Sequence, residues 1–264
     1  MTTASPADFS AAAPSKAKRK RIEPLKAIRA VRALIADKED TGQVFKIIDA
    51  LSGSVRDRMF KRFIATEMGQ RIVAEKRDLI AALNDRERLS RLPEGTLGRT
   101  YYEFMAEENL TADGLVEASR EVPLREERPE DEQIFGDRLR DSHDLWHVTT
   151  GYGRDGLGEL ALLAFSYAQT RNRGIGFIVL VGWRLSVKRN PDLKLGRVIR
   201  EGFRHGKQAK WLPAADWEAL LDKPLEEVRA LLGIMPPEAY RAVEPVTSER
   251  ERQFIEREAL KKAA

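Results

Sequence analysis

The chain has 264 residues, 42% of them hydrophobic and 33% charged, a balance typical of a soluble globular protein with one domain or two small ones. Its 46 basic and 42 acidic residues leave a net charge of +4, which argues against a dedicated nucleic-acid binder with a concentrated basic surface. The absence of cysteine excludes disulfide bonds and thiolate ligands, so any metal must be held by His, Asp or Glu.

The N-terminal segment, residues 1–21, is small and polar and then basic, without apolar periodicity, so we expect a disordered tail. It lacks the apolar core of a secretory signal, but its Ser, Ala and basic residues leave a mitochondrial transit peptide open. No stretch approaches the roughly 20 apolar residues that cross a bilayer. The longest apolar run, 174–183, is a candidate lipid-binding surface or, equally, an ordinary buried helix.

Apolar residues recur at helical spacing along most of the chain, and no run alternates apolar and polar residues with a period of two. The sequence therefore predicts an all-α fold: a single helical domain over 22–237, preceded by the disordered basic tail and followed by a charged C-terminal extension, 238–264. A turn-rich connector (92–99) and a charged loop (121–132) interrupt the helices. In chain order, the expected helices are 24–35, 44–51, 55–66, 69–82, 101–109, 112–117, 132–150, 159–170, 176–187, 195–210, 217–221, 225–232 and 248–262.

One predicted helix and the start of the next contain a candidate metal site. His143 and His147 are two of only three histidines, and their spacing of four residues places both imidazoles on one helix face. Asp144 adds a carboxylate from the flank of that face, and Glu159, after a glycine-rich bend, can supply a fourth ligand. Two neutral nitrogens and two carboxylates balance the charge of a divalent cation. We expect Zn²⁺ first, with Fe²⁺ or Mn²⁺ as alternatives.

Arg140 is the predicted substrate-binding residue of this site. The predicted helix 132–150 places Arg140 one turn before His143 and on the same arc of the helix. Its guanidinium could there hold a substrate carboxylate by two parallel hydrogen bonds, or orient Asp144 or Glu159. A metal-free interpretation stays open, because Arg140 could itself compensate the charge of Glu159.

Three known patterns look similar to this site. Zinc proteases with His-Glu-x-x-His place a general base where this chain has the shorter Asp144. Metal-dependent phosphohydrolases with a His-Asp pair need an upstream histidine, and none precedes His143. Residues 151–156 match a dinucleotide fingerprint by letters, but that fingerprint follows a strand and here a helix precedes it. We interpret this segment as a flexible hinge in which Tyr152 and Arg154 could gate the site.

The spacing of His143, Asp144 and His147, followed after eleven residues by Glu159, resembles the hallmark of the fourth coenzyme Q biosynthesis protein family (Coq-four). The resemblance extends over roughly residues 25–236 and includes the flanking segments 92–99, 138–142, 216–218 and 224–229. Membership implies a helical homodimer that lies peripherally on a membrane and accepts long polyprenyl chains. It also implies that other ubiquinone biosynthesis proteins are partners, whereas nucleic acid is not expected as one.

The resemblance implies a metal-dependent enzyme that decarboxylates and hydroxylates C1 of a polyprenylated ubiquinone precursor. Arg140 and Asp144 are then the catalytic candidates, and the metal ligands are His143, Asp144, His147 and Glu159. The alternative is a non-catalytic lipid-binding scaffold that organises the biosynthetic complex, and a zinc hydrolase is a third possibility. We expect a cytoplasmic protein bound peripherally to a membrane, which in a eukaryote would be the matrix side of the mitochondrial inner membrane.

Overall fold

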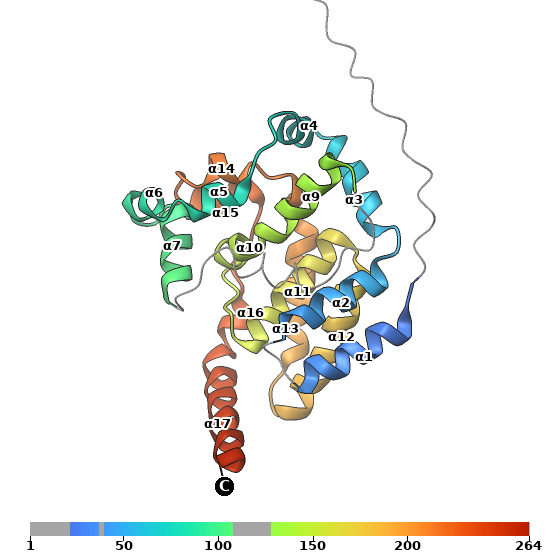
Figure 1. Ribbon diagram of the computed structural model, residues 1–264. Helices are drawn as coiled ribbons and strands as arrows, with labels where there is room; N and C mark the ends of the chain where they lie inside the picture. Colours follow the sequence, from blue (N-terminus) through green and yellow to red (C-terminus); the bar gives the residue numbers. More distant parts are fainter. Residues whose placement is uncertain (1–21, 37–39, 108–127, 264) are drawn as a thin grey trace, which may run out of the picture.

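The structure is a computed structural model that describes residues 22–36, 40–107 and 128–263. These ranges contain helices and no β-strand, apart from one isolated bridge between Thr96 and Pro224, so the predicted all-α fold is confirmed (Figure 1). The predicted tail, the predicted helix 112–117 and most of the predicted loop 121–132 lie outside the described residues. No described helix combines the length and hydropathy that crossing a membrane requires.

Most helices coincide with predicted ones. In chain order they are α1 (Pro24–Ala36), α2 (Thr41–Ser52), α3 (Val55–Ile64), α4 (Glu67–Ala74), α5 (Leu79–Asn84), α6 (Arg86–Arg91), α7 (Leu97–Glu107), α9 (Glu130–Asp141), α10 (His143–Thr150), α11 (Gly156–Thr170), α12 (Arg173–Arg189), α13 (Leu195–Gln208), α14 (Trp217–Leu220), α15 (Leu225–Leu232), α16 (Glu238–Arg241) and α17 (Glu244–Ala263). A short 3-10 turn, Leu212–Ala214, follows α13. Helix α6 was not predicted, and α7 begins inside the predicted connector 92–99.

Three apolar clusters hold these helices together. The main cluster joins α7, α10, α11, α13, α14 and α15 around the buried side chains of Tyr101, Phe165 and Trp217. A second cluster packs α1 and α2 against α12, and a third packs α3 and α4 against α9. Burial of side chains this large supplies the main driving force for folding.

Helix α11 lies at the centre of the fold and packs closely against α13 (Figure 1). Gly202 and Gly206, one turn apart on α13, face the α11 backbone: a Cβ at Gly202 would lie 2.5 Å from the carbonyl oxygen of Ala161, and one at Gly206 would collide with that of Phe165. Only glycine permits this close approach. The contact fixes both the position and the rotation of α13 against the helix that carries Glu159.

The predicted helix 69–82 is wrong as one element, because the chain forms α4 and α5 there instead. Lys76 between them has a positive φ of 47°, which ends the helical path. The side chain of Asp78 then accepts the backbone N–H of Ile80 at 3.0 Å and so caps α5.

The predicted continuous helix 132–150 is also wrong, since α9 ends at Asp141 and α10 begins at His143. Ser142 between them has φ −76° and ψ −3°, a turn-like conformation, and its hydroxyl donates to the carbonyl of Leu139 at 3.4 Å. A serine hydroxyl that hydrogen-bonds a nearby backbone carbonyl competes with the hydrogen bonds of the helix and so destabilises a helix interior. Arg140 and His143 therefore lie on different helices.

The segment after 237 makes contacts with the rest of the domain. Tyr240 on α16 is buried, and Arg250 on α17 forms an ion pair with Asp192 at 2.8 Å. Glu251 accepts the backbone N–H of Gly156 at 3.1 Å, at the first turn of α11. Helix α17 includes the predicted charged helix 248–262 and projects from the fold toward the C-terminus (Figure 1).

Candidate metal centre

Helices α10 and α11 bring three of the four predicted ligands to one point. Nε2 of His147 lies 3.3 Å from Nε2 of His143 and 3.2 Å from Oε1 of Glu159, and Oε2 of Glu159 lies 3.9 Å from Nε2 of His143. His147 is buried, whereas Glu159 keeps 40% of its side chain exposed. The site is therefore closed on the α10 side and open beside Glu159.

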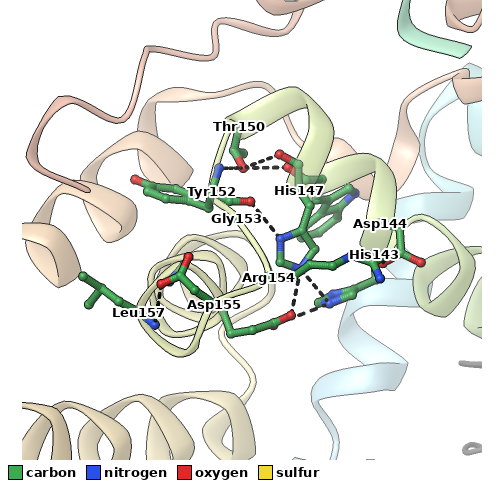
Figure 2. Close-up of polar contacts among 12 residues, drawn as sticks. His143, Asp144, His147, Thr150, Tyr152, Gly153, Arg154, Asp155 and Leu157 are labelled. Carbon is green, nitrogen blue, oxygen red and sulfur yellow. Dashed lines mark hydrogen bonds and ion pairs between the residues drawn. The ribbon is translucent and has the colours of Figure 1, made fainter. Parts of the chain in front are cut away.

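The backbone of the bend after α10 fixes the orientation of His147. Nδ1 of His147 lies 2.9 Å from the carbonyl oxygen of Tyr152 (Figure 2). Because a carbonyl oxygen only accepts hydrogen bonds, Nδ1 carries the proton and donates it. In neutral His147 the lone pair is then on Nε2 and faces the Glu159 carboxylate. Two acceptors this close require a proton or a cation between them.

Two of the three separations among these donor atoms match the ligand spacing around a metal ion, and the third, 3.9 Å between His143 and Glu159, is longer. Around a tetrahedral ion with bonds of about 2.0–2.1 Å, neighbouring ligand atoms lie about 3.3 Å apart. The separations of 3.3 Å and 3.2 Å that Nε2 of His147 makes to His143 and to Glu159 agree with this spacing. The donor set is imidazole and carboxylate, which suits Zn²⁺, Fe²⁺ or Mn²⁺.

Asp144 lies on the flank of the same group. Ligand atoms of His143, Asp144 and His147 all fall within 4.8 Å of one another. One carboxylate oxygen of Asp144 also accepts from the Arg154 guanidinium at 3.2 Å, in the bend (Figure 2). Asp144 can thus act as a ligand or as the partner that holds Arg154 beside the site.

Arg140, the predicted substrate-binding residue, contacts two carboxylates of its own segment: Asp137 at 2.9 Å and Asp141 at 2.7 Å. The helical wheel that placed Arg140 beside His143 assumed one continuous helix, and the break at Ser142 removes that assumption. The role proposed for Arg140 stays a prediction. The predicted ligand Asp144 is contacted by the guanidinium of Arg154, a residue that was predicted to lie in the hinge.

The bend between α10 and α11 is held in one conformation by several contacts. Gly151 has φ +75° and ends α10 in the left-handed conformation that glycine favours. Asp155 caps α11 by accepting the N–H groups of Leu157 and Gly158, each at 3.1 Å. Tyr240, from α16, donates its hydroxyl to Asp155 and accepts the N–H of Gly153. A hinge motion of this segment, as predicted from the sequence, would therefore have to break these contacts.

Helix α7 covers the site, and nothing in the sequence pattern indicated this. The ring of Phe104 stacks on the imidazole of His147 with 5.7 Å between centroids. The Arg154 guanidinium lies 4.4 Å from the Phe104 ring centroid and 3.0 Å from the Met105 sulfur. These contacts order Arg154 over the cluster by cation–π attraction and packing.

Electrostatics couple the two histidines and the glutamate. Burial lowers the pKa of His143, and the neighbouring charge of His147 adds to this effect. Burial also acts against protonation of His147, but the Glu159 carboxylate and the Tyr152 carbonyl outweigh it and raise the pKa of His147. Burial would raise the pKa of Glu159, yet the two histidines lower it overall. A metal ion bound at Nε2 of His147 would therefore have to displace a proton.

Fold and site together define the class: a helical protein in which a half-buried His143, a buried Asp144 and a buried His147 meet a glutamate, a donor set that could hold a divalent metal ion. The family described as coenzyme Q (ubiquinone) biosynthesis protein Coq4 matches residues 20–238. The chain belongs to this family.

Individual relatives support the assignment. The mitochondrial ubiquinone biosynthesis protein COQ4 of Yarrowia lipolytica is 31% identical over 192 residues, which cover 71% of this chain and 68% of the relative. The COQ4 proteins of Vanderwaltozyma polyspora and Pyricularia oryzae are 29% and 28% identical over 187 residues. The matches cover 69% and 70% of this chain but only 52% and 59% of those two relatives.

A solved structure has the same fold. A crystal structure of a ubiquinone biosynthesis protein from Nostoc punctiforme superposes with a TM-score of 0.60 and 23% sequence identity. The superposition covers 81% of this chain and 99% of the other. At this identity the likeness establishes the fold.

Proposed function

We propose that this chain acts in ubiquinone biosynthesis, as a metal-dependent enzyme that replaces the C1 carboxylate of a polyprenylated precursor with a hydroxyl group. The observation that carries the proposal is the convergence of Nε2 of His147, Nε2 of His143 and the Glu159 carboxylate at metal-ligand spacing. Membership of the Coq4 family and the names of the relatives point to the same pathway.

In this proposal His143, His147 and Glu159 hold the ion, with Asp144 as a fourth ligand. A bound divalent ion would supply a Lewis acid and an acidified water or ligand oxygen at the open side of the site. In the overall conversion the bond from C1 to the carboxylate breaks, CO₂ leaves and a C–O bond forms. Water supplies the hydroxyl oxygen, and dioxygen takes up the two electrons that leave the ring together with two protons, so that it becomes hydrogen peroxide.

A guanidinium is suited to hold the ring carboxylate before it leaves. Arg140 is the residue predicted for this task. Arg154 is a second candidate, because its guanidinium forms an ion pair with Asp144 beside the two histidines. Arg140→Gln and Arg154→Gln distinguish the two. The variant that removes the carboxylate-binding residue is expected to raise KM for the precursor by about tenfold while metal content is retained.

The polyprenyl chain of the precursor requires a lipid surface, and α12 offers one. Leu180, Trp183 and Val187 share one face of this helix and are 44%, 36% and 37% exposed. Arg184 and Lys188 lie beside them, placed to meet anionic head groups. Peripheral binding to a membrane, in mitochondria or at a bacterial membrane, is the location we propose. The same face also favours the scaffold alternative, in which this chain binds lipid and partner proteins without catalysis.

The test uses His147→Ala, with His205→Ala as a control that removes a buried histidine outside the site. Purified proteins are analysed for metal, and cells carrying each variant are analysed for lipids by mass spectrometry. We expect His147→Ala to fold, to lose metal and to accumulate the carboxylated precursor, whereas His205→Ala retains metal. Normal precursor processing with failed assembly of the biosynthetic proteins would instead establish the scaffold. Turnover without dioxygen would indicate a hydrolase.

A further inference from the structure

A cavity of about 260 Å³ opens between α13 and the start of α16. Its lining residues are Arg197, Arg200, Glu201, Arg204 and Ala239. None of them belongs to the candidate metal centre. The cavity is a separate feature that the proposed function does not use.

The three arginines share the outer face of α13. Their spacing of three and then four residues places them in line along a helix. The opposite face of α13 contacts α11 through Gly202 and Gly206, so the helix cannot rotate without a backbone collision. The packing therefore fixes the helix from which these three exposed arginines reach the cavity.

The charges of this cavity are unbalanced. Glu201 is the one carboxylate in the lining, and its two oxygens accept the backbone N–H groups of Ala239 at 2.8 Å and Tyr240 at 3.3 Å. Within the part of the chain that the structure describes, Arg197, Arg200 and Arg204 form no ion pair with a carboxylate. Like charges at this spacing repel one another, and an anion between them would remove that repulsion.

We propose that this cavity binds the phosphate group of a phosphorylated ligand. Guanidinium groups match phosphate oxygens by bidentate hydrogen bonds, and three of them from neighbouring turns of one helix face can reach the same anion. Three positive charges and one negative charge leave +2, which matches a phosphate monoester dianion. A volume of about 260 Å³ leaves room for a phosphate group.

The phosphate can belong to a soluble ester or to a phospholipid head group, and the experiment has one arm for each source. Calorimetry measures binding of inorganic phosphate and pyrophosphate to the full chain. Sedimentation measures binding to phosphatidylcholine vesicles with and without phosphatidic acid. The test variant is Arg200→Gln with Arg204→Gln. The control is Arg71→Gln with Arg91→Gln, which removes the same charge from α4 and α6.

We expect the test variant to weaken binding in at least one arm by about tenfold or more, while the control matches the wild type. Loss of pyrophosphate binding identifies a soluble ligand, and loss of phosphatidic-acid-dependent sedimentation identifies a head group. Equal loss in test and control variants, or no phosphate-dependent binding in either arm, overturns the proposal. Metal content and helicity are measured alongside, so a failed fold or a failed metal centre is recognised separately.

Discussion

The Nδ1 proton of His147 is donated to the carbonyl oxygen of Tyr152 over 2.9 Å, and this contact determines which nitrogen faces Glu159. A histidine ligand held at its other nitrogen in this way is fixed in tautomer and in orientation. The bend after α10 therefore does more than connect two helices. It presents the Nε2 lone pair of a buried imidazole toward the glutamate of α11.

The first prediction concerns the proton that competes with the metal. Glu159 and the Tyr152 carbonyl raise the pKa of His147, so this imidazole keeps its proton to higher pH than an ordinary histidine. Binding of Zn²⁺ or Co²⁺ must displace that proton, and calorimetry in buffers of different ionisation enthalpy is expected to show release of about one proton per ion at about pH 6.5. Affinity should rise with pH and level off above the pKa of His147. Equal affinity at about pH 5.5 and about pH 7.5 would contradict the proposed role of this nitrogen.

The second prediction tests whether Tyr240 on α16 supports the metal site by holding the bend between α10 and α11. Tyr240 contacts both Gly153 and Asp155, and its ring packs on Tyr152 with 5.5 Å between centroids. Tyr240→Phe removes the hydroxyl but keeps the ring, so we expect the helix content to be unchanged and the affinity for Co²⁺ to fall by about tenfold or more.

Visible absorption of bound Co²⁺ provides the measurement for Tyr240→Phe, because it reports the ligand geometry as well as the affinity. Tyr167→Phe is the matched control, since the Tyr167 ring packs on Phe203 instead. A Tyr240→Phe protein with the wild-type spectrum and affinity would mean that Asp155 and Gly151 hold the bend without help from α16.

The local parts of this structure could be predicted from the sequence. Helix α15 begins and ends where the apolar periodicity places it, and Asp216 caps α14, a position at which aspartate is one of the favoured residue types. The proximity of His143 and His147 follows from helix geometry alone, since they lie one turn apart. These features depend on residues that are close in the chain.

The remaining features depend on contacts between distant segments. Phe104 contacts His147 from α7, and Tyr240 contacts Gly153 across 87 residues of sequence. Neither residue stands in a pattern that a single sequence reveals. The break at Ser142 is also hidden, because one serine in an otherwise helical pattern does not interrupt the periodicity. Tertiary packing therefore decides where the guanidinium groups of Arg140 and Arg154 lie relative to the candidate metal ligands.

The third prediction concerns pH and the ion pair between Arg138 and Glu218. The Arg138 guanidinium is buried and donates to both carboxylate oxygens of Glu218, at 2.6 Å and 2.7 Å. Burial acts to raise the pKa of Glu218, but Arg138 outweighs it and the pKa is lowered. This contribution to stability is therefore present above the unfolded pKa of Glu218 and is lost as pH falls through the lower folded pKa.

We expect Glu218→Gln to lower the free energy of unfolding by on the order of 3 kcal/mol at about pH 7, because a buried guanidinium loses its partner. The difference from the wild type should shrink as pH falls below about 4. Glu87→Gln, which breaks an exposed pair with Arg91, should cost less than about 1 kcal/mol. Urea unfolding at several pH values gives the comparison, and a pH-independent difference for Glu218→Gln would rule out the ion pair as its cause.

The fourth prediction tests the glycine contact that places α13 on α11. In Gly202→Ala the new Cβ would meet the backbone carbonyl oxygen of Ala161 at 2.5 Å, and backbone cannot move aside as a flexible side chain can. The helices must separate, so we expect a loss of about 1–3 kcal/mol in unfolding free energy. Gly196→Ala is a matched control on the same helix: its Cβ would lie 3.6 Å from Nε1 of Trp183, an ordinary contact, and alanine favours helix by up to about 1 kcal/mol. Thermal melts should therefore move in opposite directions for the two variants. If both stabilise the protein, α13 is free to shift on α11, and the arginines on its outer face are not held in place by this packing.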